Sequence, residues 1–169
     1  MFGYRRTTRE CSVSQLNPRL LQALQDYFLE HKFGDLKEET LLCCETFSEK
    51  ENPSRIEALL SGNPDSSDYL GMILTEEWLL WARTAGRSAA KAFGANLKDI
   101  KVKQYRSRLT QETGLHIDGY LCDFKEHVWG NLAMGPEEAT RKFCEATREA
   151  VEKVNPPRKR KIPWFDFLS

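Results

Sequence analysis

The side chains that most often carry out chemistry are few in this chain and form no recognisable motif. Its three histidines are His31, His116 and His127, and none stands at metal-ligand spacing from a cysteine or another histidine. The closely spaced glycines of a phosphate-binding loop are also missing. A Ser/His/Asp or Cys/His arrangement would need partners distant in sequence, and nothing specific supports one. The sequence therefore predicts no catalytic residue, no metal site and no cofactor.

Two carboxylates lie close together in the sequence, Asp118 and Asp123, with Gly119-Tyr120 between them. A carboxylate pair can do general acid–base work when its surroundings separate the two pKa values. A hairpin turn is the simpler interpretation, because Asp118-Gly119 is a dipeptide that accepts the positive φ angles of a tight turn. We therefore expect a turn at this point in the chain.

Charge is balanced overall, with 25 Lys and Arg against 25 Asp and Glu, but it is unevenly distributed. Residues 37–68 contain 3 basic and 8 acidic side chains, a net charge of −5, whereas residues 83–108 contain 8 basic and 1 acidic, a net charge of +7. The basic segment could bind an anionic membrane surface. Its candidate anion-binding residues are Arg87, Lys91, Lys101, Lys103 and Arg106. The alternative is a solvated strand face whose lysines discourage edge pairing. The zero net charge does not favour a nucleic-acid binder.

Aromatic residues suggest two further candidate sites. Trp78 and Trp81, with His116, could line a pocket for a small molecule or an enzyme substrate, although aromatics in strands more often pack in the core. The C-terminal tail is too apolar for a typical solvated end. Its candidate partner-binding residues are Trp164, Phe165 and Phe167. We expect them to dock in a groove of their own domain or of a second copy, with disorder as the alternative.

These residues must be positioned by a chain that changes character twice. Asn17-Pro18 is a typical helix start, and apolar residues at three- and four-residue spacing predict a helix over 18–32 that ends near Gly34. Short β-type runs separated by turn residues follow. They span 40–47, 55–60, 69–74, 78–83, 89–93, 100–105, 114–117, 120–124 and 128–133. A second helix begins at Gly135-Pro136-Glu137-Glu138, with its buried stripe formed by Ala139, Phe143, Ala146, Ala150 and Val154.

This order of elements resembles the bacterial pleckstrin-homology-like (PH-like) and GRAM-like domain family. Residues 69–82 read Tyr-Leu-Gly-Met-Ile-Leu-Thr-Glu-Glu-Trp-Leu-Leu-Trp-Ala, which is similar to that family's hairpin of two apolar strands joined by a polar turn. The strand near Lys98-Asp99-Ile100 and the helix from Glu137 fit the family's order, and the resemblance covers roughly residues 40–154. It implies an α+β fold, namely a partly open antiparallel β-barrel of about seven or more strands, closed by a C-terminal helix. The N-terminal helix is an addition to that fold.

The expected organisation is an N-terminal arm and helix (1–36), a PH-like barrel with its closing helix (37–155) and a basic-aromatic tail (156–169). The five cysteines show no disulfide-framework spacing, and the adjacent pair Cys43-Cys44 would point to opposite faces of a strand. We therefore expect a cytoplasmic chain with reduced thiols. The resemblance and the missing catalytic motif favour a non-enzymatic interaction module that binds a protein partner or itself. Anionic-lipid binding and a small-molecule pocket or enzyme are the alternatives.

Overall fold

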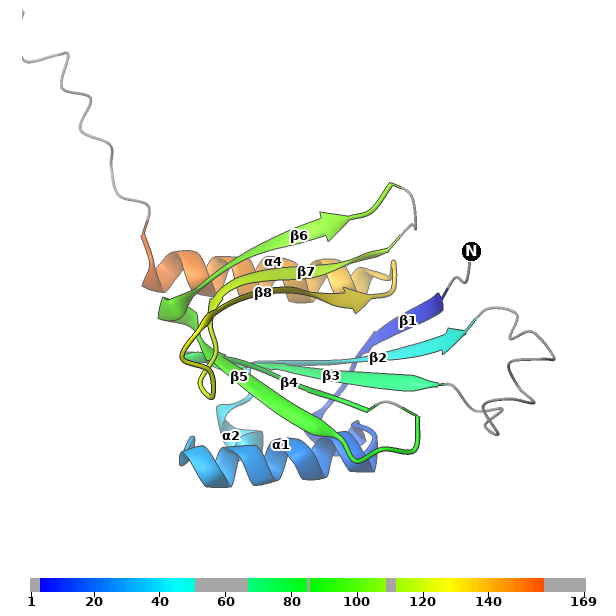
Figure 1. Cartoon of the computed structure of the whole chain (residues 1–169), viewed down its shortest axis with the longest axis horizontal. Helices are drawn as coiled ribbons and strands as arrows, with labels where there is room; N and C mark the ends of the chain where they lie inside the picture. Colours follow the sequence, from blue (N-terminus) through cyan, green and yellow to red (C-terminus); the bar gives the residue numbers. More distant parts are fainter. Residues whose placement is uncertain (1–3, 51–66, 85, 109–111, 157–169) are drawn as a thin grey trace, which may run out of the picture.

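The computed structural model describes residues 4–50, 67–84, 86–108 and 112–156, and these form an α+β fold with eight strands in two antiparallel sheets (Figure 1). Sheet A has the strand order β1 (Tyr4–Glu10), β2 (Leu42–Lys50), β3 (Asp68–Leu74), β4 (Trp78–Arg83) and β5 (Lys91–Asn96). Sheet B has the order β6 (Ile100–Arg106), β7 (Thr113–Tyr120) and β8 (His127–Met134). Within the described residues, the strands form no closed barrel.

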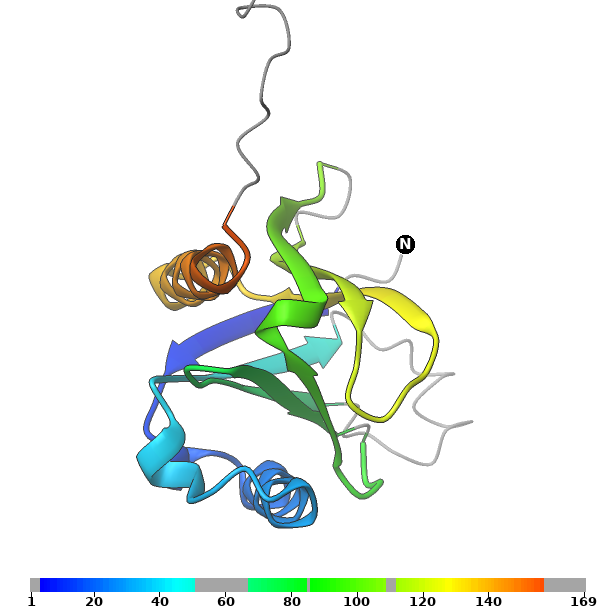
Figure 2. The same cartoon turned by 90° about the vertical axis from the view of Figure 1, so that its left-hand side faces the viewer.

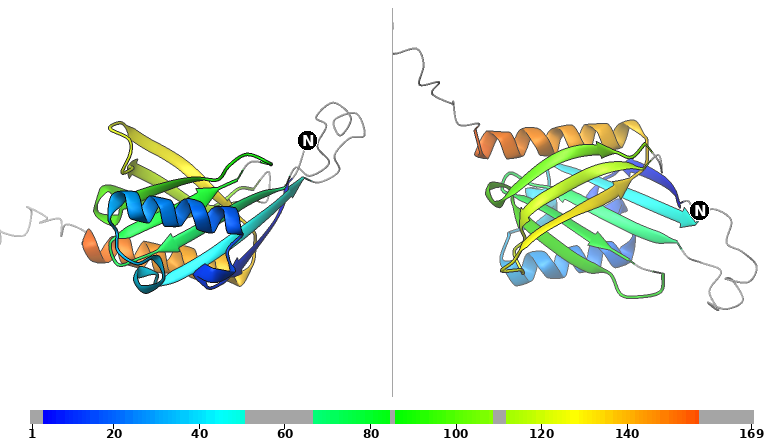
Figure 3. Two further views of the ribbon diagram at one scale, coloured as in Figure 1. Left: turned by 90° about the horizontal axis from the view of Figure 1, so that it is seen from below. Right: turned by 45° about the horizontal axis from the view of Figure 1, so that its top comes forward.

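The helices lie on opposite sides of sheet A. Helix α1 (Pro18–His31) and the short α2 (Leu36–Glu39) are on its outer side, whereas sheet B and α4 (Glu138–Val154) are on its inner side (Figures 1 and 2). Two short 3-10 segments are also present. The first, η1 (Val13–Gln15), precedes α1, and the second, η2 (Leu97–Asp99), joins β5 to β6. Figure 3 shows α1 lying across the strands of sheet A and α4 lying beside sheet B.

Sheet A is buried on both faces, which explains the continuous apolar runs in its central strands. Met72 packs in the inner core with α4, its neighbour Ile73 packs in the outer core with α1, and both are fully buried. Cys43 and Cys44 divide in the same way, which confirms that they point to opposite faces. At Gly94 the outer face admits no side chain, because an added Cβ would lie 2.9 Å from the ring of Tyr27 on α1.

The predicted first helix is confirmed, and a buried carboxylate helps to fix its start. The Asn17 side chain accepts a hydrogen bond from the Arg19 amide, as expected of an N-cap. Glu45 is 5% exposed, accepts a hydrogen bond from the Asn17 amide at 2.5 Å and pairs with Arg9 at 2.9 Å. The helix ends on Lys32, which takes the left-handed conformation before the glycine at which the sequence predicted the end.

The C-terminal helix is also confirmed, with its buried stripe centred slightly differently. Its buried residues are Thr140, Phe143, Cys144, Thr147 and Val151, and the predicted alanines lie at the edges of this stripe. Hydrogen bonds join its start to sheet A: the Gly135 amide donates to the Thr8 hydroxyl at 2.8 Å, and the Thr8 amide donates to Glu137 at 2.8 Å. Because Glu137 is the N-cap, Pro136 precedes the helix instead of occupying its first turn.

Two strand predictions need correction. The strand β1 was not predicted, because its residues are mostly charged and Thr8 is its one buried side chain. The turn predicted at Asp118-Gly119 is wrong, since both residues lie inside β7, which continues to Tyr120. Gly119 pairs with Ile100, and an added Cβ there would lie 2.1 Å from the Asp99 carbonyl oxygen. The glycine therefore allows two backbones to approach closely and does not make a hairpin turn.

The predicted strand 120–124 is wrong, because β7 ends at Tyr120 and residues 121–126 form the loop before β8. Other predicted boundaries shift by a few residues. The run 89–93 corresponds to β5, which begins at Lys91, whereas 78–83 coincides with β4. The run 55–60 lies outside the described residues. Residues 4–36 of the predicted N-terminal unit contribute β1 to sheet A and α1 to its outer face, so this part of the chain is integral to the fold. Among the helices of the described segments, none combines the length and apolar character needed to cross a lipid bilayer.

Candidate functional site

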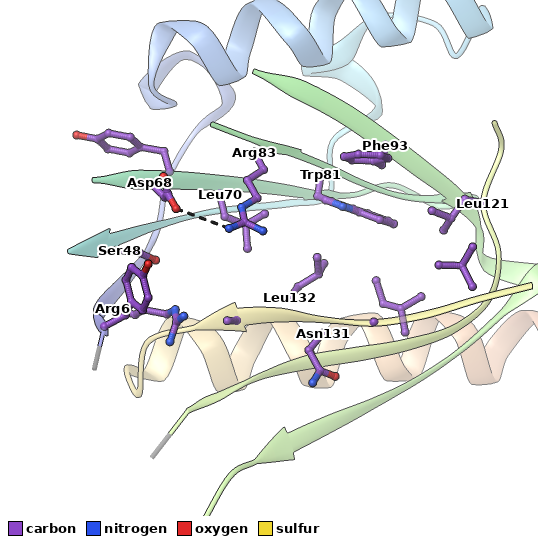
Figure 4. Close-up of a pocket in the computed structure, with 16 residues that line it drawn as sticks. Arg6, Ser48, Asp68, Leu70, Trp81, Arg83, Phe93, Leu121, Asn131 and Leu132 are labelled. Carbon is purple, nitrogen blue, oxygen red and sulfur yellow. Dashed lines mark ion pairs between the residues drawn. The ribbon is translucent and has the colours of Figure 1, made fainter. Parts of the chain in front are cut away.

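A cavity of about 380 Å³ lies between the inner face of sheet A and strand β8 (Figure 4). Its apolar wall on sheet A is formed by Leu70, Trp81 and Phe93, and Leu132 faces them from β8. The volume falls within the range of small-molecule sites, roughly 300–1,000 Å³. On the other side of the inner core, Phe143 of α4 fills the space between the sheets, so the hollow is confined to the side away from that helix.

Trp81 and Phe93 line the cavity, and Phe124 extends their row of aromatic rings beyond it. The rings of Trp81 and Phe93 are stacked with centroids 5.8 Å apart, and those of Phe93 and Phe124 are stacked at 6.4 Å, with the same interplanar angle of 22°. Trp81 is buried, whereas Phe124 is 43% exposed, so the row runs from the interior to the surface. This wall offers an apolar ligand a long, flat contact surface.

The opposite end of the cavity is polar. Arg6, Ser48, Asp68 and Arg83 all face inward near the same end of sheet A, and Figure 4 shows Arg83 and Asp68 directed toward one another. Arg83 is 65% exposed and lies 3.6 Å from Asp68. Arg6 is more tightly engaged, since it pairs with Glu112 at 2.6 Å. The cavity therefore changes from apolar to charged along the direction of the strands.

Gly130 in the middle of β8 contributes to the open space. It lines the cavity between the inward-facing Val128 and Leu132, and an added Cβ there would meet nothing within 4 Å. Its neighbour Asn131 points away from the cavity (Figure 4), where its amide oxygen lies 2.7 Å from Nδ1 of His116. A larger side chain at position 130 would consequently project into the hollow.

The loop between β7 and β8 forms the far wall of the cavity and is held by two elements. Leu121 lines the cavity, and the next amide, that of Cys122, donates to the Gly94 carbonyl of β5 at 2.8 Å. Asp123 accepts hydrogen bonds from the Tyr27 hydroxyl at 2.6 Å and from Nε2 of His31 at 2.8 Å. These contacts attach the loop to both α1 and the edge of sheet A.

The hydrogen bonds between Asp123, Tyr27 and His31 favour the charged forms of Asp123 and His31. Burial works to raise the pKa of Asp123, but hydrogen bonds from Tyr27 and His31 outweigh it and hold the pKa below its usual value. Burial likewise works to lower the pKa of His31, but the bonds to Asp123 and to the Tyr27 carbonyl, with the nearby negative charges, together outweigh it and leave the pKa raised. Burial, reinforced by the bond to Asp123, raises the pKa of the Tyr27 phenol.

Although this cluster contains the residue types of a catalytic triad, its geometry is structural. Nδ1 of His31 lies 3.0 Å from the Tyr27 carbonyl oxygen while Nε2 faces Asp123, so both ring nitrogens have acceptors. Burial raises the pKa of the nearby Cys122 thiol, which opposes formation of a reactive thiolate. In the described residues, no group of three or more His, Cys, Asp or Glu side chains could hold a metal ion.

The structure separates the residues proposed for a tryptophan pocket. Trp81 faces the cavity, but Trp78 lies on the outer face of sheet A and stacks on Phe33 at 4.3 Å. His116 is on the outer face of sheet B, so the three side chains do not line one pocket, and of the three it is Trp81 that lines the cavity. The two tryptophans are three residues apart in a strand and therefore point to opposite faces.

The five basic candidates occupy two different regions. Lys91, at the start of β5, points to the same face of the strand as Phe93, and its ammonium group lies 5.3 Å from the centre of that ring. Arg87 is in the exposed connection that precedes β5. Lys101 and Lys103 are exposed on the outer face of sheet B, with Arg106 at the end of the same strand. Ile100 and Val102 alternate with the two lysines and pack in the inner core, and the five cations do not form one continuous stripe.

The residues that sequence reasoning missed are Arg6, Asp68, Arg83 and Gly130. The sequence did contain a signal for Gly130, because this glycine interrupts the apolar positions of the predicted strand 128–133. Asp118 and Asp123 are engaged by different partners, since Asp118 pairs with His127 at 2.9 Å. The candidates Trp164, Phe165 and Phe167 lie outside the described residues.

Comparison of the chain with protein-family models, with curated proteins and with solved structures finds no match.

Proposed function

We propose that this chain is a non-catalytic binding module with a PH-like arrangement of strands, whose ligand places an apolar portion in the cavity between sheets A and B. The PH-like part of the proposal is supported by the order of elements. Four consecutive antiparallel strands, β2 to β5, are followed by three more, β6 to β8, and then by α4 packed against the inner face. Strand β1 and helix α1 would be additions to that arrangement.

The observation that carries the proposal is the open space in front of Gly130. A strand residue that faces the inside of a two-sheet fold normally fills that space with a side chain. Here a glycine leaves it open, opposite the apolar side chains Leu70, Trp81 and Phe93. The combination of concave shape, apolar lining and a few polar groups at one end is the usual make-up of a ligand site.

The titratable groups support binding over catalysis. The His31, Asp123 and Tyr27 cluster has its hydrogen-bonding capacity used internally, and it attaches the loop at the far wall of the cavity. The charged side chains at the polar end, Arg6 and Arg83, are groups that bind anions and are poorly suited to proton transfer.

A neutral apolar dye tests the proposal. Nile red should gain fluorescence with the wild-type chain, and Gly130→Phe should abolish the gain by filling the cavity. Trp129→Phe is the matched control on the same strand, because Trp129 is 74% exposed on the opposite face. This substitution should leave dye binding unchanged. Circular dichroism verifies that each variant is folded, and Gly130→Leu serves as a milder block. Equal dye binding by wild type and both folded Gly130 variants would contradict the proposal.

Partner binding and membrane binding remain predictions, and each rests on other residues than those of the cavity. Binding of a protein partner or a second copy was inferred from the C-terminal aromatics, which lie outside the described residues. Binding of an anionic membrane was inferred from five basic residues that occupy separate regions of the fold. The cavity gives the binding-module proposal its more specific structural support.

A further inference from the structure

The charged end of the cavity indicates which class of apolar ligand fits it. Within sheet A, the inward-facing residues change from apolar to polar over a short distance, because Leu70 is paired in register with Arg83, and Arg83 is paired with Lys91. A wholly apolar ligand would leave this end of the cavity in contact with water or with nothing. A ligand with one polar end would contact both parts.

The sign of the charge follows from how tightly each cation is already engaged. Arg6 is held by Glu112 at 2.6 Å and its side chain is 15% exposed, so it is largely neutralised. Arg83 lies 3.6 Å from the Asp68 carboxylate, its one ion-pair partner among the described residues, and remains mostly exposed. Lys91 adds a second cation beside Phe93 on the neighbouring strand. Among the described side chains, Glu112 is paired with Arg6 and Asp123 is paired with His31. Arg83 and Lys91 therefore face Asp68 as the remaining described carboxylate, which leaves a net positive charge beside the polar end.

We infer that the ligand is a single-chain amphipathic anion, with its apolar part against Trp81 and Phe93 and its anionic group beside Arg83. This inference rests on the proposed function, since it names the class of ligand that the same cavity binds. A carboxylate or sulfonate would accept hydrogen bonds from the guanidinium of Arg83 and attract the ammonium of Lys91. A cationic end would be repelled by both side chains.

Three ten-carbon amphiphiles below their aggregation concentrations test the inference by isothermal titration calorimetry: decanoate, 1-decanol and decyltrimethylammonium. The wild-type chain should bind decanoate most tightly, decanol less tightly and the cation most weakly. Arg83→Gln should weaken decanoate binding by up to about fivefold, the scale of one partly exposed ion pair, and leave decanol binding unchanged. Added salt should weaken decanoate binding and not decanol binding.

Lys103→Gln is the matched control, because it removes the same charge from the outer face of sheet B. It should leave decanoate binding unchanged. If decanol binds as tightly as decanoate and Arg83→Gln alters neither, the anionic part of the inference is wrong, although the cavity still binds apolar ligands. If no amphiphile binds the wild-type chain, or Gly130→Phe leaves all binding intact, the proposed function itself fails.

Phosphatidylglycerol vesicles distinguish a free amphiphile from a bilayer surface as the source of the anion. If the anion binds in the cavity, Gly130→Phe should block its binding. In that case sedimentation of the chain with the vesicles should not depend on Lys101 or Lys103. Sedimentation that is lost in a Lys101→Gln/Lys103→Gln double variant and kept in Gly130→Phe would overturn the inference. It would assign the anion site to the outer face of sheet B.

Discussion

Replacing Asp123 by asparagine should detach the loop at the far wall of the cavity from helix α1. In the native chain the Asp123 carboxylate accepts hydrogen bonds from the Tyr27 hydroxyl and from His31. Hydrogen bonds to a charged group contribute about 1.5–3 kcal/mol when well shielded from water. The Asp123 side chain is 42% exposed, and an amide oxygen can still accept from Tyr27, so we expect Asp123→Asn to cost about 1–2 kcal/mol.

The loss should depend on pH in a defined window. The lowered pKa of Asp123 means that its contribution is complete above the pKa of an unfolded aspartate, about 3.9, and is lost as the pH falls through the lower folded value. The raised pKa of His31 means that its contribution is complete below the pKa of an unfolded histidine, about 6.5, and is lost as the pH rises through the higher folded value. The difference between wild type and variant should therefore be largest between about pH 4 and 6.5.

Urea denaturation at a series of pH values measures this difference, and for a chain of this size it corresponds to roughly 4 °C in melting temperature at pH 5. Above the raised pKa of folded His31 a smaller difference should remain, because the Tyr27 hydroxyl still donates to the carboxylate. Asp118→Asn is the control, since Asp118 pairs with His127 at a similar distance but both side chains are about half exposed. Its effect should stay below about 0.5 kcal/mol. Equal, pH-independent losses for the two variants would refute the reasoning.

Three further predictions test the packing. Gly119→Ala should destabilise the fold by about 2 kcal/mol or more, because the added Cβ would lie 2.1 Å from a backbone oxygen, whereas Gly130→Ala should be nearly neutral in the same urea melts. Phe143→Ala should cost about 3–5 kcal/mol in thermal or urea unfolding, since its fully buried ring fills the space beneath α4, and a loss below 1 kcal/mol would contradict this packing. The sulfur atoms of Cys11 and Cys43 are 3.8 Å apart, so diamide should oxidise the two thiols to a disulfide and be reduced to the hydrazine. Non-reducing peptide mapping should find this pair joined. It should not find Cys44 joined to Cys144.

The elements with a strong apolar period could be predicted from the sequence. Helix α1 has an N-cap, a proline and an apolar stripe, and β4 is a short apolar run between polar turns. Strand β1 could not be predicted in this way, because it lies at the edge of sheet A and buries little beyond Thr8. Its place in the fold depends on pairing with β2 and on hydrogen bonds to the start of α4.

The candidate site was harder to predict because its parts are far apart in the sequence. The spacing of Tyr27 and His31 places them together on a helix, but their partner Asp123 is more than 90 residues away. The dipeptide Asp118-Gly119 has the chemistry of a turn, yet the backbone of β6 approaches it so closely that only a glycine fits. The cavity depends on the separation of two sheets, which no local pattern specifies.

The most direct test of the central claim is where a bound amphiphile lies. Methyl groups of the leucine side chains, labelled with ¹³C, should report it in NMR spectra recorded during a titration with decanoate. Leu70, Leu121 and Leu132 line the cavity, so their methyl signals should shift in a saturable way. Leu29 is 80% exposed on α1 and should not shift. Shifts confined to Leu29 and other surface leucines, or saturable binding without any change at the cavity leucines, would contradict the account.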